Sequence, residues 1–120
     1  MSTATAKDAI VQTVLDYFEG WFDGDTARME RALHPDLAKR GYGNELPPQL
    51  GLTTAKRMLE LTSTGEGKQD AADRRIDVQL EDVHRNIASV TVRTAVYHEY
   101  LHLVRTNEGW KIANALWEPT

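Results

Sequence analysis

Residues 97–120, with the sequence YHEYLHLVRTNEGWKIANALWEPT, decide the fold. Apolar and polar side chains alternate on both sides of Thr106-Asn107-Glu108-Gly109, and alternation with a period of two is typical of half-buried β-strands. Asparagine and glycine tolerate positive φ, so these four residues favour a tight turn. The stretch therefore predicts a long β-hairpin that turns one face toward the core.

The register of this hairpin predicts which residues share its inner face. Pairing Arg105 with Trp110 fixes the other pairs: Leu103 with Ile112, Leu101 with Asn114, and Glu99 with Leu116. Glu99 and Asn114 then lie near each other on the inner face. A buried polar group costs free energy unless it has a partner, so these two either satisfy each other or face a ligand. A bulge near Val96 and Tyr97 would instead turn Glu99 outward.

The composition limits the classes of function. A net charge of −4, with 14 scattered lysines and arginines, argues against a nucleic-acid-binding surface. The absence of cysteine excludes disulfides and thiolate chemistry, which fits a cytoplasmic protein. The sequence has no apolar signal core and no stretch long enough to span a membrane. The length of 120 residues suits one domain, 1–120, with residues 1–6 as a loose lead-in.

Helical periodicity precedes the strands. Apolar residues three and four positions apart predict a helix over residues 5–22, with Val14, Tyr17, Phe18 and Trp21 on one face. A second helix is predicted over residues 26–33 and a third after residue 54. Asp25 is expected to cap the second helix and Thr53 or Thr54 the third, which carries Met58 on one of its faces.

The remaining segments complete an α+β architecture. A short strand is expected at residues 37–43, a loop at 43–51 and a mobile loop at 62–72. From residue 74 onward the period changes to two, which predicts an antiparallel meander that ends in the long hairpin. Helices that precede an antiparallel sheet are expected to cover one of its faces.

Two segments carry a resemblance to a known family: GDTARMERALHPD at residues 24–36 and HEYLHLVRTNEGWKIANALWEP at 98–119. With the order of elements, they resemble the nuclear-transport-factor-2-like superfamily, the cone-shaped fold of ketosteroid isomerase, and within it the putative lumazine-binding, SnoaL-like group. The resemblance implies three N-terminal helices packed on a curved, mostly antiparallel sheet, with a deep pocket between the first helix and the sheet. It also implies a homodimer through the outer sheet face, where Tyr100 and His102 are too aromatic for a plainly solvated surface.

The candidate ligand-binding residues combine the inner face of the hairpin with the helices: Tyr17, Trp21, His34, Met58, Glu99 and Asn114. Tyr17 and Trp21 are aromatic residues whose polar atoms need partners, so they suit either the core or the pocket edge. His34 before Pro35 suits either a helix C-terminus, where a histidine favours the dipole, or the pocket.

The motif His98-Glu99-Tyr100-Leu101-His102 matches the H-E-x-x-H signature of zinc proteases. That signature requires a helix, in which residues four apart share a face. On a strand the two histidines lie roughly 13 Å apart, too far to bind one zinc ion. We therefore expect no metal, and we interpret both histidines as residues of the outer face.

The sequence supports three hypotheses about the function of the protein. The first is a small-molecule-binding protein without a cofactor, whose ligand is partly apolar and of ring size. The second is a cofactor-free isomerase, cyclase or dehydratase that uses His34 or Glu99 as its acid or base and Tyr17 or Asn114 as a donor. Alignment with ketosteroid isomerase places Gly41 at about its general-base position, which argues against that enzyme's mechanism. The third is a structural dimerisation module with a filled interior.

Overall fold

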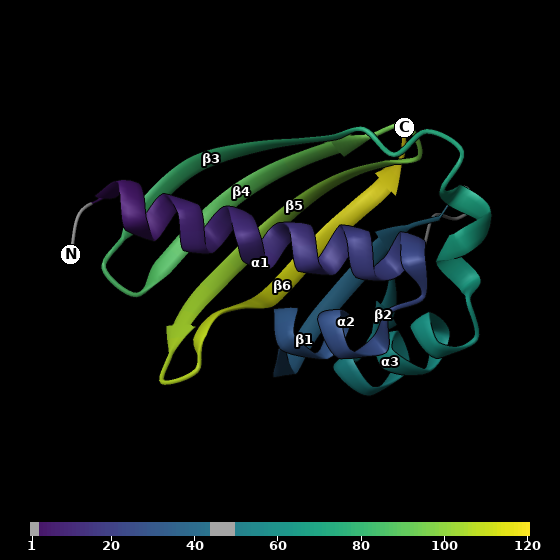
Figure 1. The fold of residues 1–120 in the computed structure, drawn as a ribbon, viewed down its shortest axis with the longest axis horizontal. Coiled ribbons are helices and arrows are strands. Elements are labelled where there is room, and N and C mark those ends of the chain that lie inside the picture. Colours follow the sequence, from purple (N-terminus) through teal and green to yellow (C-terminus); the bar gives the residue numbers. More distant parts are fainter. Residues whose placement is uncertain (1–2, 44–49) are drawn as a thin grey trace.

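The computed structural model describes residues 3–43 and 50–120, in which a curved sheet wraps around one long helix (Figure 1). The elements in chain order are α1 (Thr3–Asp23), α2 (Thr26–Ala32), β1 (Leu33–Tyr42), β2 (Leu50–Thr53), α3 (Ala55–Ser63), the 3-10 helix η1 (Glu66–Asp70), β3 (Ile76–His84), β4 (Ile87–Thr94), β5 (Tyr97–Thr106) and β6 (Gly109–Pro119). In this part of the chain, no helix has both the length and the apolar character needed to cross a bilayer.

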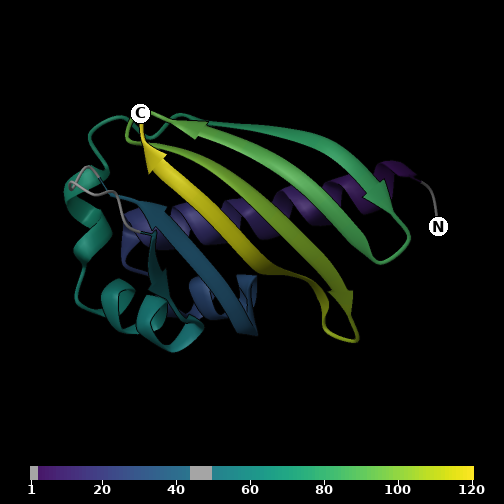
Figure 2. The same cartoon turned by 180° about the vertical axis from the view of Figure 1, so that it is seen from behind.

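The sheet has the strand order β2-β1-β6-β5-β4-β3, and every neighbouring pair is antiparallel except β1 with β6. Helix α1 lies across its concave face, and α2, α3 and η1 gather at the end where β1 and β2 lie (Figure 1). Seen from behind, the outer face is open along its strands (Figure 2). The predicted α+β class, with helices packed on a curved and mostly antiparallel sheet, is confirmed.

The apolar face of α1 closes onto the inner face of the sheet. Val14, Tyr17 and Phe18 are buried as expected, and Trp21 is half-buried. The helix packs against β-branched and leucine side chains from three strands: Val90, Val92, Leu101, Leu103 and Ile112. Each of these apolar groups leaves water on folding, which makes this layer the main source of stability.

The caps of the two shorter helices agree with the sequence. The Asp25 carboxylate accepts a hydrogen bond from Arg28 N at 3.1 Å, and the Thr54 hydroxyl accepts one from Arg57 N at 3.2 Å. Both bonds satisfy a backbone donor that a helix N-terminus leaves free.

Four local predictions need correction. Helix α1 begins at Thr3, so residues 3–6 of the predicted loose lead-in are helical. Strand β1 begins at Leu33, directly after α2, and so includes His34 and Pro35. Residues 50 and 51 belong to β2, whereas Pro47 and Pro48 of the predicted loop lie outside the described residues. The segment expected as a mobile loop at 62–72 contains the end of α3 and all of η1.

Tertiary packing explains the order of η1. Gly65 has a φ of 78°, which ends α3 and starts the 3-10 helix. Gly67 packs so closely on α1 that an added Cβ would lie 2.4 Å from the Trp21 carbonyl oxygen. A contact between residues so far apart in sequence produces no local sequence pattern, so residues 62–72 look like a loop when only the sequence is read.

The hairpin register is correct near the turn and wrong beyond it. Leu103 pairs with Ile112 as predicted, but a β-bulge follows at Ala113. Beyond the bulge His102 pairs with Asn114, which is therefore exposed on the outer face. The predicted inner-face position of Asn114 is wrong. Glu99 is only 1% exposed, because the alternation of β5 continues unbroken to its start.

We expect Trp110→Ala to lower the free energy of unfolding by about 3–5 kcal/mol, the range for removing a large buried aromatic side chain. Trp110 is 7% exposed and belongs to the core. Urea titration measures the loss, with Ile87→Ala as the control because Ile87 is a strand residue that is 55% exposed. A loss below about 1 kcal/mol for Trp110→Ala, similar to that of a surface substitution, would contradict the assignment.

Candidate functional site

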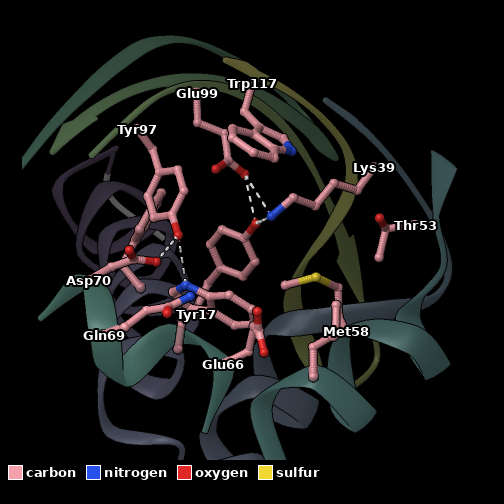
Figure 3. Close-up of a pocket in the computed structure, with 13 residues that line it drawn as sticks. Tyr17, Lys39, Thr53, Met58, Glu66, Gln69, Asp70, Tyr97, Glu99 and Trp117 are labelled. Carbon is pink, nitrogen blue, oxygen red and sulfur yellow. Dashed lines mark hydrogen bonds and ion pairs between the residues drawn. The ribbon is translucent and has the colours of Figure 1, made fainter. Parts of the chain in front are cut away.

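A cavity of about 280 Å³ lies between α1 and the inner face of the sheet, bounded at one end by α3 and η1 (Figure 3). Its lining is aromatic with several charged groups: Tyr17, Phe18, Trp21, Lys39, Thr53, Met58, Leu61, Glu66, Gln69, Asp70, Tyr97, Glu99 and Trp117. A concave, mostly apolar site with a few convergent polar groups is the usual form of a small-molecule site.

Three side chains from three elements meet at the polar centre of this cavity. The Tyr17 hydroxyl on α1 donates a 2.7 Å hydrogen bond to Glu99 Oε2 on β5. Lys39 on β1 donates to the same hydroxyl, and its Nζ lies 3.9 Å from Glu99 Oε2. The side chains of Lys39 and Glu99 are 12% and 2% exposed, so the group lies almost entirely out of water. Figure 3 shows these bonds as dashed lines.

Burial controls the protonation of this group. It raises the pKa of Tyr17 well above the usual value, and the neighbouring Glu99 carboxylate raises it further, so Tyr17 stays a neutral hydroxyl. Burial lowers the pKa of Lys39, while the attraction of Glu99 acts in the opposite direction. Lys39 therefore gives up its proton more readily than an ordinary surface lysine.

The group keeps hydrogen-bonding capacity that the protein does not use. Among the described residues, Lys39 Nζ donates only to Tyr17, and Glu99 Oε1 has no hydrogen-bond partner. A lysine ammonium has three donors and a carboxylate accepts at both oxygens. Because Lys39 and Glu99 both line the cavity, a molecule in it can accept from Nζ and donate to Glu99.

A second group of three polar side chains also lines the cavity. Trp21 Nε1 donates a 3.0 Å hydrogen bond to the Tyr97 hydroxyl, which in turn donates to Asp70 on η1. Burial, reinforced by the hydrogen bond to Asp70, raises the pKa of Tyr97 far above its ordinary value. These two hydrogen bonds link α1, β5 and η1 and hold the end wall of the cavity in place.

Trp117 supplies the wall beside Lys39. Its ring meets that of Tyr97 edge-to-face, with centroids 5.3 Å apart, and Lys39 Nζ lies 5.6 Å from the Trp117 ring centre. Gly41 makes this position possible, because an added Cβ would lie 2.7 Å from the indole. Gly41, which aligns with the general-base position of ketosteroid isomerase, thus packs closely against an aromatic ring.

The six predicted ligand-binding residues divide into two groups. Tyr17, Trp21, Met58 and Glu99 line the cavity, although contact with a ligand remains a prediction. His34 does not line it: the ring is half-exposed at the start of β1, where Nδ1 accepts a 3.0 Å hydrogen bond from Asp36 N. Asn114 lies on the outer face because of the bulge.

Sequence reasoning missed Lys39, Asp70, Tyr97 and Trp117. Tyr97 shares the inward phase of Glu99 two residues later, so the strand period could have identified it. Trp117 faces inward only because of the bulge. The strand period could not reveal Lys39 or Asp70, since β1 lacks a clear alternation and η1 was interpreted as a loop.

The H-E-x-x-H motif lies on a strand, as predicted. His98 and His102 point to the outer face, whereas Glu99 points into the cavity. Within residues 3–43 and 50–120, no group of three or more histidine, aspartate or glutamate side chains is placed to hold a metal ion.

We expect Tyr17→Phe to lower the free energy of unfolding by about 1–3 kcal/mol, because it deletes the hydrogen bond to a buried carboxylate while keeping the ring. Tyr42→Phe is the matched control, since Tyr42 is 43% exposed and its substitution should change stability by less than about 0.5 kcal/mol. Urea titration of both variants measures the difference. Equal small losses would mean that the Tyr17 hydroxyl is as well solvated as a surface phenol.

The comparisons with known proteins agree with this architecture. A family model described as putative lumazine-binding matches residues 5–118. An NTF2-like protein of unknown function from Silicibacter pomeroyi DSS-3 is 17% identical, with all of both chains covered and a TM-score of 0.78. Similar proteins from Shewanella baltica OS155 and Methylobacillus flagellatus KT are 11% and 16% identical, cover all of this chain and 98% and 95% of theirs, and have TM-scores of 0.72 and 0.71. No curated protein matches the chain. The chain belongs to the putative lumazine-binding family and has the nuclear-transport-factor-2-like fold.

Proposed function

We propose that this protein binds a small, flat, ring-containing molecule in the cavity between α1 and the sheet. The observation that carries the proposal is the buried group of Lys39, Tyr17 and Glu99, whose unused donors and acceptor line an aromatic cavity. Buried polar groups are normally satisfied within the protein. Hydrogen-bonding capacity that the protein leaves unused at a cavity wall therefore supports the presence of a ligand there.

The size and lining of the cavity define the class of ligand. Its volume of about 280 Å³ is near the lower end, about 300 Å³, of the range for small-molecule sites, which suits one or two rings. Tyr17, Trp21, Tyr97 and Trp117 offer ring surfaces for stacking. Lumazine, the compound in the family's name, is a fused two-ring heterocycle with carbonyl acceptors and ring N–H donors. A carbonyl could accept from Lys39 while an N–H donates to Glu99.

Titration with lumazine tests this proposal, because Trp21 and Trp117 line the cavity and report binding through their fluorescence. We expect saturable quenching with one molecule per chain. Lys39→Met should weaken affinity at least about tenfold, since a hydrogen bond to a charged group contributes roughly 1.5 kcal/mol or more.

His34→Ala is the control and should bind as the unchanged protein does, because His34 lies outside the cavity. Native mass spectrometry of the purified protein extends the search to other one- and two-ring molecules. If neither lumazine nor any such heterocycle binds, the proposal is contradicted.

We also propose that two copies of the chain associate through the outer face of the sheet, around Tyr100 and His102. Tyr100 and Leu116 pair across β5 and β6 and are 53% and 46% exposed. Tyr42 and Leu50 line a shallow hollow beside them. His98 Nε2, next to this surface, is buried and has no hydrogen-bond partner among the described residues. A twofold pairing is the commonest way to cover such a face and can supply that partner.

Sedimentation velocity tests the association, and we expect a dimer at micromolar concentration. Leu116→Glu should give a monomer, because it places a charge in the centre of the apolar patch. Gln79→Glu adds the same charge at an exposed position of the edge strand β3 and should leave the dimer intact. A monomeric unchanged protein, or equal effects of both substitutions, would count against this surface.

A further inference from the structure

We infer that Lys39 is a nucleophile whose amine forms an imine with an aldehyde or ketone bound in the cavity. This inference rests on the proposed binding of small molecules and names a chemical class for the ligand. It assigns Lys39 a covalent role in addition to a hydrogen-bonding one.

The position of Lys39 suits this role. It is the only lysine among the residues that line the cavity, and its side chain is 12% exposed. Its Nζ lies 5.0 Å and 5.6 Å from the ring centres of Tyr17 and Trp117. A carbonyl compound that stacks on these rings would bring its carbon close to the amine, and such positioning replaces much of the entropic cost of a bimolecular encounter.

The ion pair that favours the charged form of Lys39 is a long one. Its Nζ lies 3.9 Å from Glu99 Oε2, close enough for an ion pair but too far for a hydrogen bond. Arg31, in contrast, binds the Asp16 carboxylate at 2.9 Å. Lys39 instead donates to a neutral hydroxyl. Burial lowers its pKa, and the neutral amine is the form that attacks a carbonyl carbon.

The chain from Lys39 to Tyr17 to Glu99 can move the protons that imine formation requires. Tyr17 accepts from Lys39 and donates to Glu99, so a proton can pass from the ammonium to the carboxylate while Tyr17 remains a hydroxyl. The raised pKa of Tyr17 agrees with such a relay, because the phenolate is never formed.

The reaction balances without an oxidant or a reductant. The nitrogen lone pair forms a bond to the carbonyl carbon, and the π electrons of the carbonyl move to oxygen, which takes one of the protons of the nitrogen. The resulting carbinolamine loses its hydroxyl as water, with the proton that Glu99 received from the ammonium returned through Tyr17. Ammonium and carbonyl become protonated imine and water, and Glu99 is again a carboxylate.

Acetylacetone tests the inference, because this 1,3-diketone condenses with a neutral amine to a conjugated enaminone that absorbs in the near ultraviolet. At neutral pH exposed lysines are almost entirely protonated. We expect one enaminone per chain, mapped to Lys39 by peptide mass spectrometry, and formed at least about tenfold faster than at any exposed lysine, because burial lowers the pKa of Lys39 and the cavity positions the diketone at its amine.

Two variants sharpen the test. Lys39→Arg should abolish the absorbance, whereas Lys111→Arg should keep it. Lys111 is also buried, but it lies outside the cavity and its Nζ donates to the Arg31 carbonyl oxygen. Mapping the labelled lysines of the unsubstituted protein tests the inference even if a variant fails to fold. Labelling spread over exposed lysines such as Lys7 and Lys56, with no preference for Lys39, would overturn the inference.

Lumazine separates this inference from the proposed function. If lumazine binds but Lys39 forms no enaminone, binding stands and the nucleophilic role is wrong. If Lys39 is labelled and lumazine does not bind, the nucleophile stands and the ligand belongs to another class of carbonyl compound. If lumazine binds and slows the labelling of Lys39, both events occur in the same cavity.

Discussion

The hydrogen bond between Tyr17 and Glu99 is the constraint on which the cavity depends. A carboxylate that is 1% exposed loses its hydration, and an uncompensated ion in the interior costs several kcal/mol. Compensation comes from α1 through Tyr17 and from β1 through Lys39, while the carboxylate itself belongs to β5. These contacts therefore fix the position of α1 over the sheet and its rotation about the helix axis. The cavity opens beside this polar group, with Tyr17, Lys39 and Glu99 in its lining.

The two halves of α1 show how one helix contributes both to the core and to the wall of the cavity. Ile10 and Val14 are fully buried in the apolar core. About one and two turns later, Tyr17 and Trp21 present hydroxyl and indole N–H groups that bond to Glu99 and Tyr97. The helical repeat thus continues while the chemistry of the buried face changes from aliphatic to amphipathic, and the aliphatic half can hold the aromatic half in place.

Periodicity predicts the parts of the fold that repeat and fails where one residue breaks the repeat. The alternation of β5 was sufficient to place Glu99 inside, because no bulge interrupts that strand before it. The extra residue Ala113 in β6 reversed the phase of Asn114 and brought Trp117 inward. Such a bulge moves the following side chains to the opposite face of the sheet without changing the composition of the strand, so the sequence pattern does not predict it. Lys39 was missed for another reason: β1 lies between β2 and β6 and contacts α3, and its burial follows these tertiary contacts more than a period of two.

The energetics of Lys39 and Glu99 favour a functional origin over a structural one. Replacement of a buried ionic group by apolar residues of similar volume is often neutral or stabilising, so such a group is a weak device for stability. The chain contains a contrasting case in Asp16, which accepts hydrogen bonds from Arg28 and Arg31 across the junction of α1 and α2. Burial disfavours the Asp16 charge, but the bonds from Arg31 and Arg28 outweigh it and lower the pKa of that carboxyl, so the network is satisfied without any ligand. Lys39 and Glu99 lie instead beside open space with bonding capacity to spare. Stability alone gives no reason to keep a lysine there, whereas a ligand that meets both groups does.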